Sequence, residues 1–205
     1  DRLAAAAAEG KEKGVKGLPM KLGIEMAAEM IPADLEDSNM TILYMEQGGL
    51  GMGNRDYYTE AENANLKAAY RTYLARIFEL TGVEGDVEKM VDNVMAVEDR
   101  LAAKHWTNVE CRDIVKGYNP YTYETFKVKY KGVDWDAYFK AMGVRNIEKI
   151  VVSQPSSFAN TLAVLKSASL DELRAYVAAH YISSAASYLS EDFALASFEF
   201  FGRTM

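Results

Sequence analysis

Cysteine and histidine are scarce in this chain. Its 205 residues include one cysteine, Cys111, and two histidines, His105 and His180. A single cysteine excludes an internal disulfide framework. A zinc hydrolase needs several protein ligands around an open position, but neither histidine lies in an H-E-x-x-H motif, and Cys111 follows His105 at a spacing unusual for zinc ligands. The sequence therefore predicts no metal site in this chain; these three residues would be the ligands if one existed.

An excess of positive charge and a long apolar run are also missing. The formal net charge of -7 indicates no general attraction to nucleic acid. No apolar run approaches the ~20 residues of a membrane span. The opening DRLAAAAAEG is not a signal peptide, because its alanine run is short and weakly apolar, so we expect a mature region or a fragment. The 49% of hydrophobic and 26% of charged residues are the balance of a soluble globular protein.

Motifs for an activated nucleophile are absent as well. Ser183, Ser184 and Ser187 lie in a helical pattern without a G-x-S-x-G elbow, so we interpret them as small residues for close helix packing. A nucleophilic pair of Cys111 with either histidine is an open alternative. The favoured interpretation is a buried, apolar Cys111, with His180 packed on the flank of a helix.

The sequence does contain a series of amphipathic helical patterns. Apolar residues recur at helical spacing in five stretches, residues 61–81, 86–104, 155–167, 170–189 and 191–201. The short loop between the first two favours an antiparallel pair. N-caps are predicted at Asp86, Thr122, Asp134 and Ser190, and S-x-x-E at Ser169 and Glu172 predicts a capping box. We expect an all-α domain of long antiparallel helices, with at most a short strand or extended segment near 147–152.

The stretch QGGLGMGNRDYY, residues 47–58, is rich in glycine. It lacks the G-x-G-x-x-G order and the lysine of a phosphate loop, so no nucleotide site is expected. We interpret it as a structural corner that needs positive φ angles and close backbone approach. We expect the residues that follow to anchor this corner without a catalytic role. The arginine can donate two hydrogen bonds to carboxylates or carbonyls, and the tyrosines combine apolar rings with a polar hydroxyl. The predicted corner residues are Gly48, Gly49, Gly51, Arg55, Asp56, Tyr57 and Tyr58.

The same stretch carries a family resemblance. Residues 34–58, DLEDSNMTILYMEQGGLGMGNRDYY, resemble the G-G-L-G-L-P-x-R-D-Y-Y region of the neprilysin and endothelin-converting-enzyme family of zinc metallopeptidases, which includes bacterial oligopeptidase O. The segment RDIVKGYNPYT resembles the family's R-D-x-x-x-x-Y-N-x-M-T, with Tyr121 in place of Met. It adds four predicted structural residues, Arg112, Asp113, Tyr118 and Asn119. The resemblance covers residues 33–205, and residues 1–32 form a poorly matched N-terminal segment.

The resemblance implies a function for a longer protein. In this family the zinc-binding H-E-x-x-H helix and the later glutamate ligand lie in a C-terminal half, and this chain stops before them. The chain then resembles the noncatalytic helical region that encloses the substrate chamber and restricts access to it, with the catalytic half of the same polypeptide and peptide substrates as partners. Zinc belongs to that missing half, so the chain alone is expected to be inactive. The alternative is a stand-alone helical binding or scaffold domain without peptidase activity.

The compartment is a separate expectation. The family has cytoplasmic, periplasmic and membrane-anchored members, and the low cysteine count disfavours its disulfide-rich animal ectodomains. A bacterial periplasm or cell envelope is therefore favoured over the cytoplasm.

Overall fold

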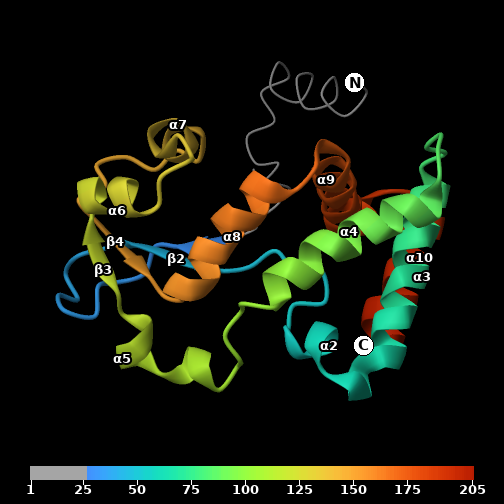
Figure 1. Ribbon diagram of the computed structural model, residues 1–205, viewed down its shortest axis with the longest axis horizontal. Coiled ribbons are helices and arrows are strands. Elements are labelled where there is room, and N and C mark those ends of the chain that lie inside the picture. The colour runs from blue at the N-terminus through green and yellow to red at the C-terminus, as the bar shows by residue number, and fades with distance from the viewer. Residues whose placement is uncertain (1–26) are drawn as a thin grey trace.

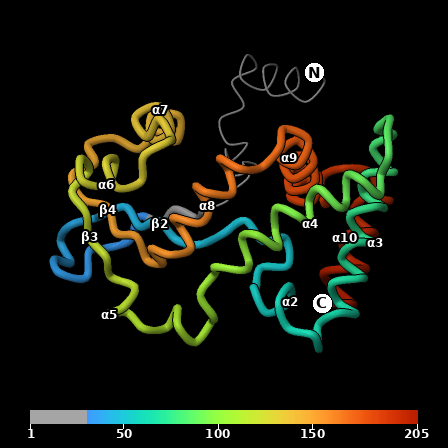
Figure 2. The backbone as a smooth tube through the Cα atoms, in the orientation of Figure 1, coloured from blue at the N-terminus to red at the C-terminus, as the bar shows by residue number. Residues whose placement is uncertain are grey.

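A small sheet is joined to a larger helical part. The computed structural model describes residues 27–205; residues 1–26, most of the poorly matched segment 1–32, lie outside the described residues. In Figure 1 the sheet lies at one end, the long helices lie at the other, and α8 (Pro155–Ser167) lies between them. Figure 2 shows the chain passing to the helices after β2 (Leu43–Gln47), returning after α4 (Val87–Ala102) and crossing again after α8. The two parts are therefore built from interleaved stretches of sequence.

The sheet has four short strands in the order β1-β2-β4-β3. The other three strands are β1 (Ala27–Met30), β3 (Pro120–Thr122) and β4 (Lys149–Val152). β4 pairs parallel with β2 and antiparallel with β3, while β1 pairs antiparallel with β2. Ile150, Val151 and Val152 are fully buried, as befits a central β-branched strand covered on both faces.

The predominantly helical fold is confirmed, but the sheet is larger than expected. The strand expected near 147–152 exists as β4. The expectation of at most one short strand is wrong, because β2 and β3 pair with β4 and β1 pairs with β2. Strands this short carry too little alternation to be recognised in a sequence, and β2 opens directly into the glycine-rich corner.

All five predicted stretches are helical, but the last contains only the short α10 (Glu191–Ser197) and the start of a π-helical segment. Besides α4 and α8, the helical elements of the described residues are α2 (Asp56–Thr59), η2 (Ala61–Asn63), α3 (Ala64–Leu80), η3 (Glu110–Arg112), α5 (Ile114–Gly117), α6 (Tyr123–Lys129), α7 (Trp135–Ala141), α9 (Leu170–Ala185), η4 (Ala186–Tyr188), α10 (Glu191–Ser197) and the π-helical η5 (Phe198–Thr204). The capping box at Ser169 and Glu172 forms, and Asp86, Thr122 and Asp134 each accept a backbone N–H bond. Ser190 precedes α10 but makes no side-chain cap, so that predicted N-cap is wrong.

The helical part is held together by α3, α4 and α9. Lys67 pairs with Asp99 at 2.6 Å and Arg71 with Asp92 at 2.6 Å, so residues farther along α3 meet residues earlier in α4. This order is the predicted antiparallel arrangement. The apolar stripes of the two helices and of α9 meet in one core, whose fully buried members include Leu74, Ile77, Val94, Val97, Leu101 and Ala179.

A second, aromatic core covers one face of the sheet. Phe126 of α6, Trp135 of α7 and Phe158 of α8 pack together, with ring centroids 4.9–5.9 Å apart. The indole Nε1 of Trp135 donates to the Tyr130 carbonyl at 2.6 Å, so the one polar atom of this buried ring is satisfied. This core fixes the sheet, and with it the end of β2 from which the corner starts.

Candidate functional site

The glycine-rich corner, residues 48–55, carries the chain from β2 to α2. Gly49 and Gly53 have φ angles of 84° and 76°, a region that side chains disfavour. A Cβ on Gly51 would overlap the hydroxyl of Tyr70 and lie 3.1 Å from Oε1 of Glu98. The side chain of Asn54 accepts from the Asp56 N–H at 3.1 Å and so closes the corner into α2. The corner lies close against one spot on α3 and α4, and that spot is polar.

The polar spot is Glu98, which is 0% exposed within α4. Tyr58 donates its hydroxyl to Oε2 at 2.7 Å, and Tyr70 donates to Oε1 at 3.0 Å. Nε2 of His180 lies 2.7 Å from Oε1. A buried carboxylate is costly unless it is paired and hydrogen-bonded, and these three groups, from α2, α3 and α9, supply that compensation. We call Glu98, Tyr58, Tyr70, His180 and the adjoining Tyr176 the Glu98 cluster.

The Glu98 cluster also holds the backbone of the corner. The Tyr58 hydroxyl accepts from the Met52 N–H at 2.9 Å, and the Tyr176 hydroxyl donates to the Gly49 carbonyl at 2.7 Å. The Tyr176 ring packs on His180 with centroids 4.2 Å apart. Burial, followed by the nearby Glu98 charge, raises the pKa of Tyr58, Tyr70 and Tyr176 well above the usual range. All three phenols therefore stay protonated and act as donors.

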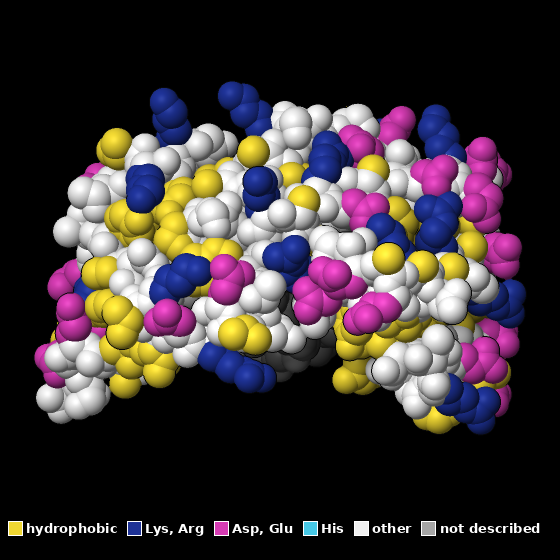
Figure 3. Space-filling view, turned by 60° about the horizontal axis from the view of Figure 1, so that its bottom comes forward, with side chains coloured by type: hydrophobic (Ala, Val, Ile, Leu, Met, Phe, Trp, Pro, Cys, Tyr) yellow, Lys and Arg dark blue, Asp and Glu magenta, His cyan; other side chains and the backbone are white. Residues whose placement is uncertain are grey.

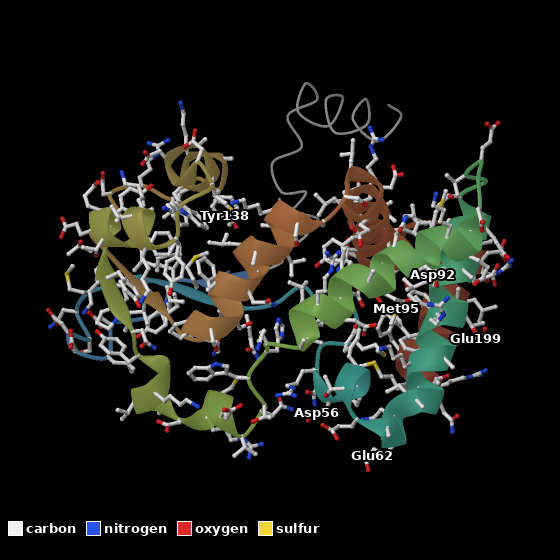
Figure 4. The ribbon with its side chains drawn as sticks, viewed as in Figure 1. Asp56, Glu62, Asp92, Met95, Tyr138 and Glu199 are labelled. Carbon is white, nitrogen blue, oxygen red and sulfur yellow. The ribbon has the colours of Figure 1, made fainter. Side chains whose placement is uncertain are left out.

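Arg55 links the corner to the segment after α4, where the chain returns from the helices to the sheet. Its Nη1 donates to the His105 carbonyl at 3.3 Å, and its Nε lies 3.7 Å from Oδ1 of Asp56. Figure 4 shows Asp56 at the start of α2, beside this segment. His105 is 5% exposed, and burial lowers its pKa to about 4, so the imidazole is neutral at pH 7. Within residues 27–205 its Nε2 and the Nε of Arg55 are buried without a hydrogen-bond partner.

The second set of predicted residues lies elsewhere, at the sheet. The Tyr118 hydroxyl donates to Asp34 at 2.6 Å, and the Lys149 ammonium donates to Asp34, Glu36 and Tyr118 at 2.6–2.8 Å. The hydrogen bond from Lys149 is the largest cause that lowers the pKa of Asp34 to about 2. Burial, then the bond to Asp34, raises the pKa of Tyr118 to about 12. This Lys149 cluster ties β4 to the segment before β2.

The remaining predicted residues surround α5. Asp113 caps this helix by accepting from the Lys116 N–H at 2.9 Å, and Asn119 donates to the Lys116 carbonyl at 2.8 Å. Arg112 is exposed, and its guanidinium has no hydrogen bond or ion pair among the described residues. Of the residues predicted for the corner, Gly48 directly follows β2, and Tyr57 lies in α2, where it packs half-buried against the helical core. The two predicted sets are therefore not brought together into one site.

The comparisons with known proteins agree with this architecture. The sequence model of Peptidase family M13 matches residues 2–205. The chain belongs to peptidase family M13. This confirms the resemblance to the neprilysin and endothelin-converting-enzyme family.

Relatives within M13 are considerably longer than this chain. A neutral endopeptidase of Lactobacillus helveticus is 23% identical over 83% of the chain and 26% of its own length. Neprilysin-2 of Drosophila melanogaster is 26% identical over 80% of the chain and 22% of its length. The crystal structure of the Mycobacterium tuberculosis zinc metalloprotease Zmp1 with an inhibitor superposes with a TM-score of 0.82 at 28% identity, covering 98% of this chain and 30% of that one. The chain thus spans between 22% and 30% of the length of these relatives.

The described residues do not form a site for the zinc ion that the family resemblance implies. No group of three or more His, Cys, Asp or Glu side chains within residues 27–205 could hold a metal ion. His180 is bound to Glu98, and His105 lies buried near Arg55. Cys111 contacts Gln47, Gln154 and the Trp106 carbonyl, not a histidine. The expectation of a buried Cys111 is wrong, because η3 lies on the surface and leaves the thiol exposed.

Sequence reasoning gave no role to the central residue of the Glu98 cluster. Glu98 falls in the segment DNVMAVEDRLAAKHW, which resembles a family helix, but the resemblance assigns it no role, although it lies among Val94, Val97 and Leu101 on the buried side of α4. A charged residue inside an apolar stripe is the signal that would have identified it, since buried charges need partners. His180 does lie on the flank of a helix, but as the partner of a buried carboxylate.

Proposed function

We propose that this chain is the noncatalytic helical part of a zinc metalloendopeptidase that hydrolyses oligopeptides, and that it forms part of the wall of the substrate chamber. Membership of M13 over residues 2–205 is the observation that carries the proposal. The relatives' names describe endopeptidases and a zinc metalloprotease. We call the longer polypeptide to which the chain would belong the parent.

The chemistry of the Glu98 cluster supports a structural role for this chain. Catalytic acids and bases must reach a substrate within hydrogen-bond distance. The carboxylate of Glu98 is fully buried and already accepts bonds from two phenols beside its histidine. Its three partners come from three helices, so the cluster positions the corner against the helical core. In this proposal Arg55, Asp56 and the corner glycines likewise shape the fold.

The distribution of hydrophobic side chains on the surface supports a role in which this chain packs against the rest of the parent. Figure 3 shows acidic and basic side chains interspersed over one face, while hydrophobic side chains gather at its left end and lower right. No helix among the described residues is long and apolar enough to cross a membrane. The zinc ligands are proposed to lie in the rest of the parent, and a bacterial periplasm or cell envelope is the proposed location.

The test compares the chain with its parent. Both proteins are purified and dialysed, and zinc content and cleavage of a fluorogenic oligopeptide are measured. The parent is expected to hold about one zinc per molecule and to cleave the peptide, and the 205-residue chain to do neither. Cleavage by the chain alone would overturn its noncatalytic role. A parent without zinc and without cleavage would overturn the assignment to a working peptidase.

A further inference from the structure

Helix α9 is apolar on more than one face. Tyr176 and Ala179 are buried in the helical core. From Ala175 to Ala186 the sequence has no Asp, Glu, Lys or Arg, and Ala178 and Ala185 are only partly buried. A helix that is apolar all round is normally packed on more than one side. The described residues cover only part of α9.

A groove runs along the uncovered side of α9. Its volume is about 1030 Å³, and its other walls include Phe78 of α3, Met90 of α4 and Phe193 of α10. The lining positions in α9 are residues 171, 174, 175, 178, 181, 182 and 185, a helical i, i+3, i+4 stripe along the whole helix. At 1.5 Å per residue that stripe is roughly 21 Å long. Small-molecule pockets reach about 1,000 Å³, so the volume alone does not decide the occupant; the length of the stripe along the helix is what favours a polypeptide segment.

The floor and the rim define what kind of segment fits. Ala175, Ala178 and Ala185 have no side chain beyond Cβ, so another backbone can approach closely. The charges lie at the rim and repeat the same order, with Asp86 and Lys89 on the α4 side and Asp171 and Arg174 on the α9 side. Each rim offers one acid and one base three residues apart. A helix with an apolar stripe and flanking charges of both signs matches this arrangement.

We propose that the groove along α9 is the docking site for an amphipathic helix from the part of the parent that lies outside this chain. This proposal rests on the proposed function, in which the chain is one part of a longer M13 peptidase. In the Zmp1 crystal structure the matched region is 30% of the chain, so most of such a polypeptide is available to supply the helix. Its basic side chains would face Asp86 and Asp171, and its acidic ones Lys89 and Arg174.

Cysteine accessibility tests the docking. In a Cys111→Ser background, which removes the exposed native thiol, Ala178→Cys places a thiol in the groove. Ala163→Cys is the matched control, because Ala163 is an exposed helical alanine on α8 outside the groove. Labelling by a maleimide is followed in the 205-residue chain and in the parent. Cys substitutions for alanine are small, and circular dichroism checks that each variant folds.

The expected result is protection of the groove only in the parent. The thiol at 178 should react in the chain and at least about tenfold more slowly in the parent, while the thiol at 163 reacts alike in both. Equal labelling at 178 would overturn the docking. Protection in the chain alone that rises with its concentration would overturn the choice of occupant in favour of a second copy. Zinc content and peptide cleavage of the same parent variants report on the proposed function separately, so an active parent with an open groove rejects only the docking.

Discussion

Replacing Glu98 with glutamine should destabilise the fold far more than the same change at its neighbour. In the Glu98 cluster both carboxylate oxygens accept, Oε2 from Tyr58 and Oε1 from Tyr70, with His180 beside Oε1. Glutamine keeps the volume but turns one acceptor into a donor. That donor then faces a phenol or the imidazole of His180, so at least one of the three hydrogen bonds at this buried position is lost.

The expected magnitude follows from burial. Leaving a buried polar group unsatisfied costs roughly 1–3 kcal/mol, and hydrogen bonds to a charged group contribute roughly 1.5–3 kcal/mol each. Because glutamine still accepts one bond, we expect a loss of about 3 kcal/mol. For a chain of this size each kcal/mol lowers the Tm by roughly 2–4 °C. The Glu98→Gln variant should therefore melt about 6–12 °C below the wild type.

Asp99→Asn is the matched control. It makes the same acid-to-amide change one residue along α4, where Asp99 is 43% exposed and pairs with Lys67 at 2.6 Å. An exposed ion pair contributes about 0–1 kcal/mol. Tm values from circular dichroism and urea unfolding of both variants give the comparison. If Glu98→Gln melts within about 2 °C of the wild type, or if the two variants lose equal stability, the buried hydrogen bonds of Glu98 do not hold the corner.

Three further outcomes are expected. The pKa of His105 falls from 6.5 in the unfolded chain to about 4 in the folded chain, so between these pH values the unfolded chain binds one more proton. The contribution of the neutral, buried His105 to the free energy of unfolding is therefore fully present above pH 6.5, and about 3 kcal/mol of it is lost as the pH falls toward 4. Urea unfolding at several pH values should show this slope, and His105→Gln should flatten it. Gly51→Ala should lower the Tm because its Cβ overlaps the Tyr70 hydroxyl, and adding Tyr70→Phe should cost less than the sum of the two single changes in a double-mutant cycle. Asp34, whose pKa is lowered to about 2 beside Lys149, contributes stability above its unfolded pKa of 3.8 that is lost as pH falls toward 2; acid titration of Asp34→Asn should lack this component, whereas an unchanged acid limb would contradict it.

The long helices could be predicted from the sequence because their signals are local. The apolar stripes of α3 and α4, the N-cap at Asp86 and the capping box at Ser169 all lie within a few turns of what they specify. The strands could not, because β2 has five residues and its parallel neighbour β4 has four. Their pairing joins segments about a hundred residues apart, and no local pattern records it.

Only the local part of the site could be predicted from the sequence. The glycines indicated a corner, and Gly49 and Gly53 do take positive φ angles. What the corner lies against depends on α4 and α9, so the role of Glu98 with His180 needed the tertiary structure. The assignment of the corner residues to structure rather than catalysis stays a prediction for the variants above to test.

The interleaved path of the chain has a consequence for its synthesis. Leu43 of β2 pairs with Ile150 of β4, and the histidine that lies beside Glu98 is synthesised 82 positions later. At about 5–20 residues per second, roughly 5–20 s pass between the emergence of β2 from a ribosome and that of its parallel neighbour. During that interval an apolar strand edge is exposed on an incomplete chain, and Glu98, once synthesised, still lacks its His180 partner when β4 emerges. The order of translation therefore makes the nascent protein dependent on late residues, and a chaperone that binds apolar strands has a defined window in which to act.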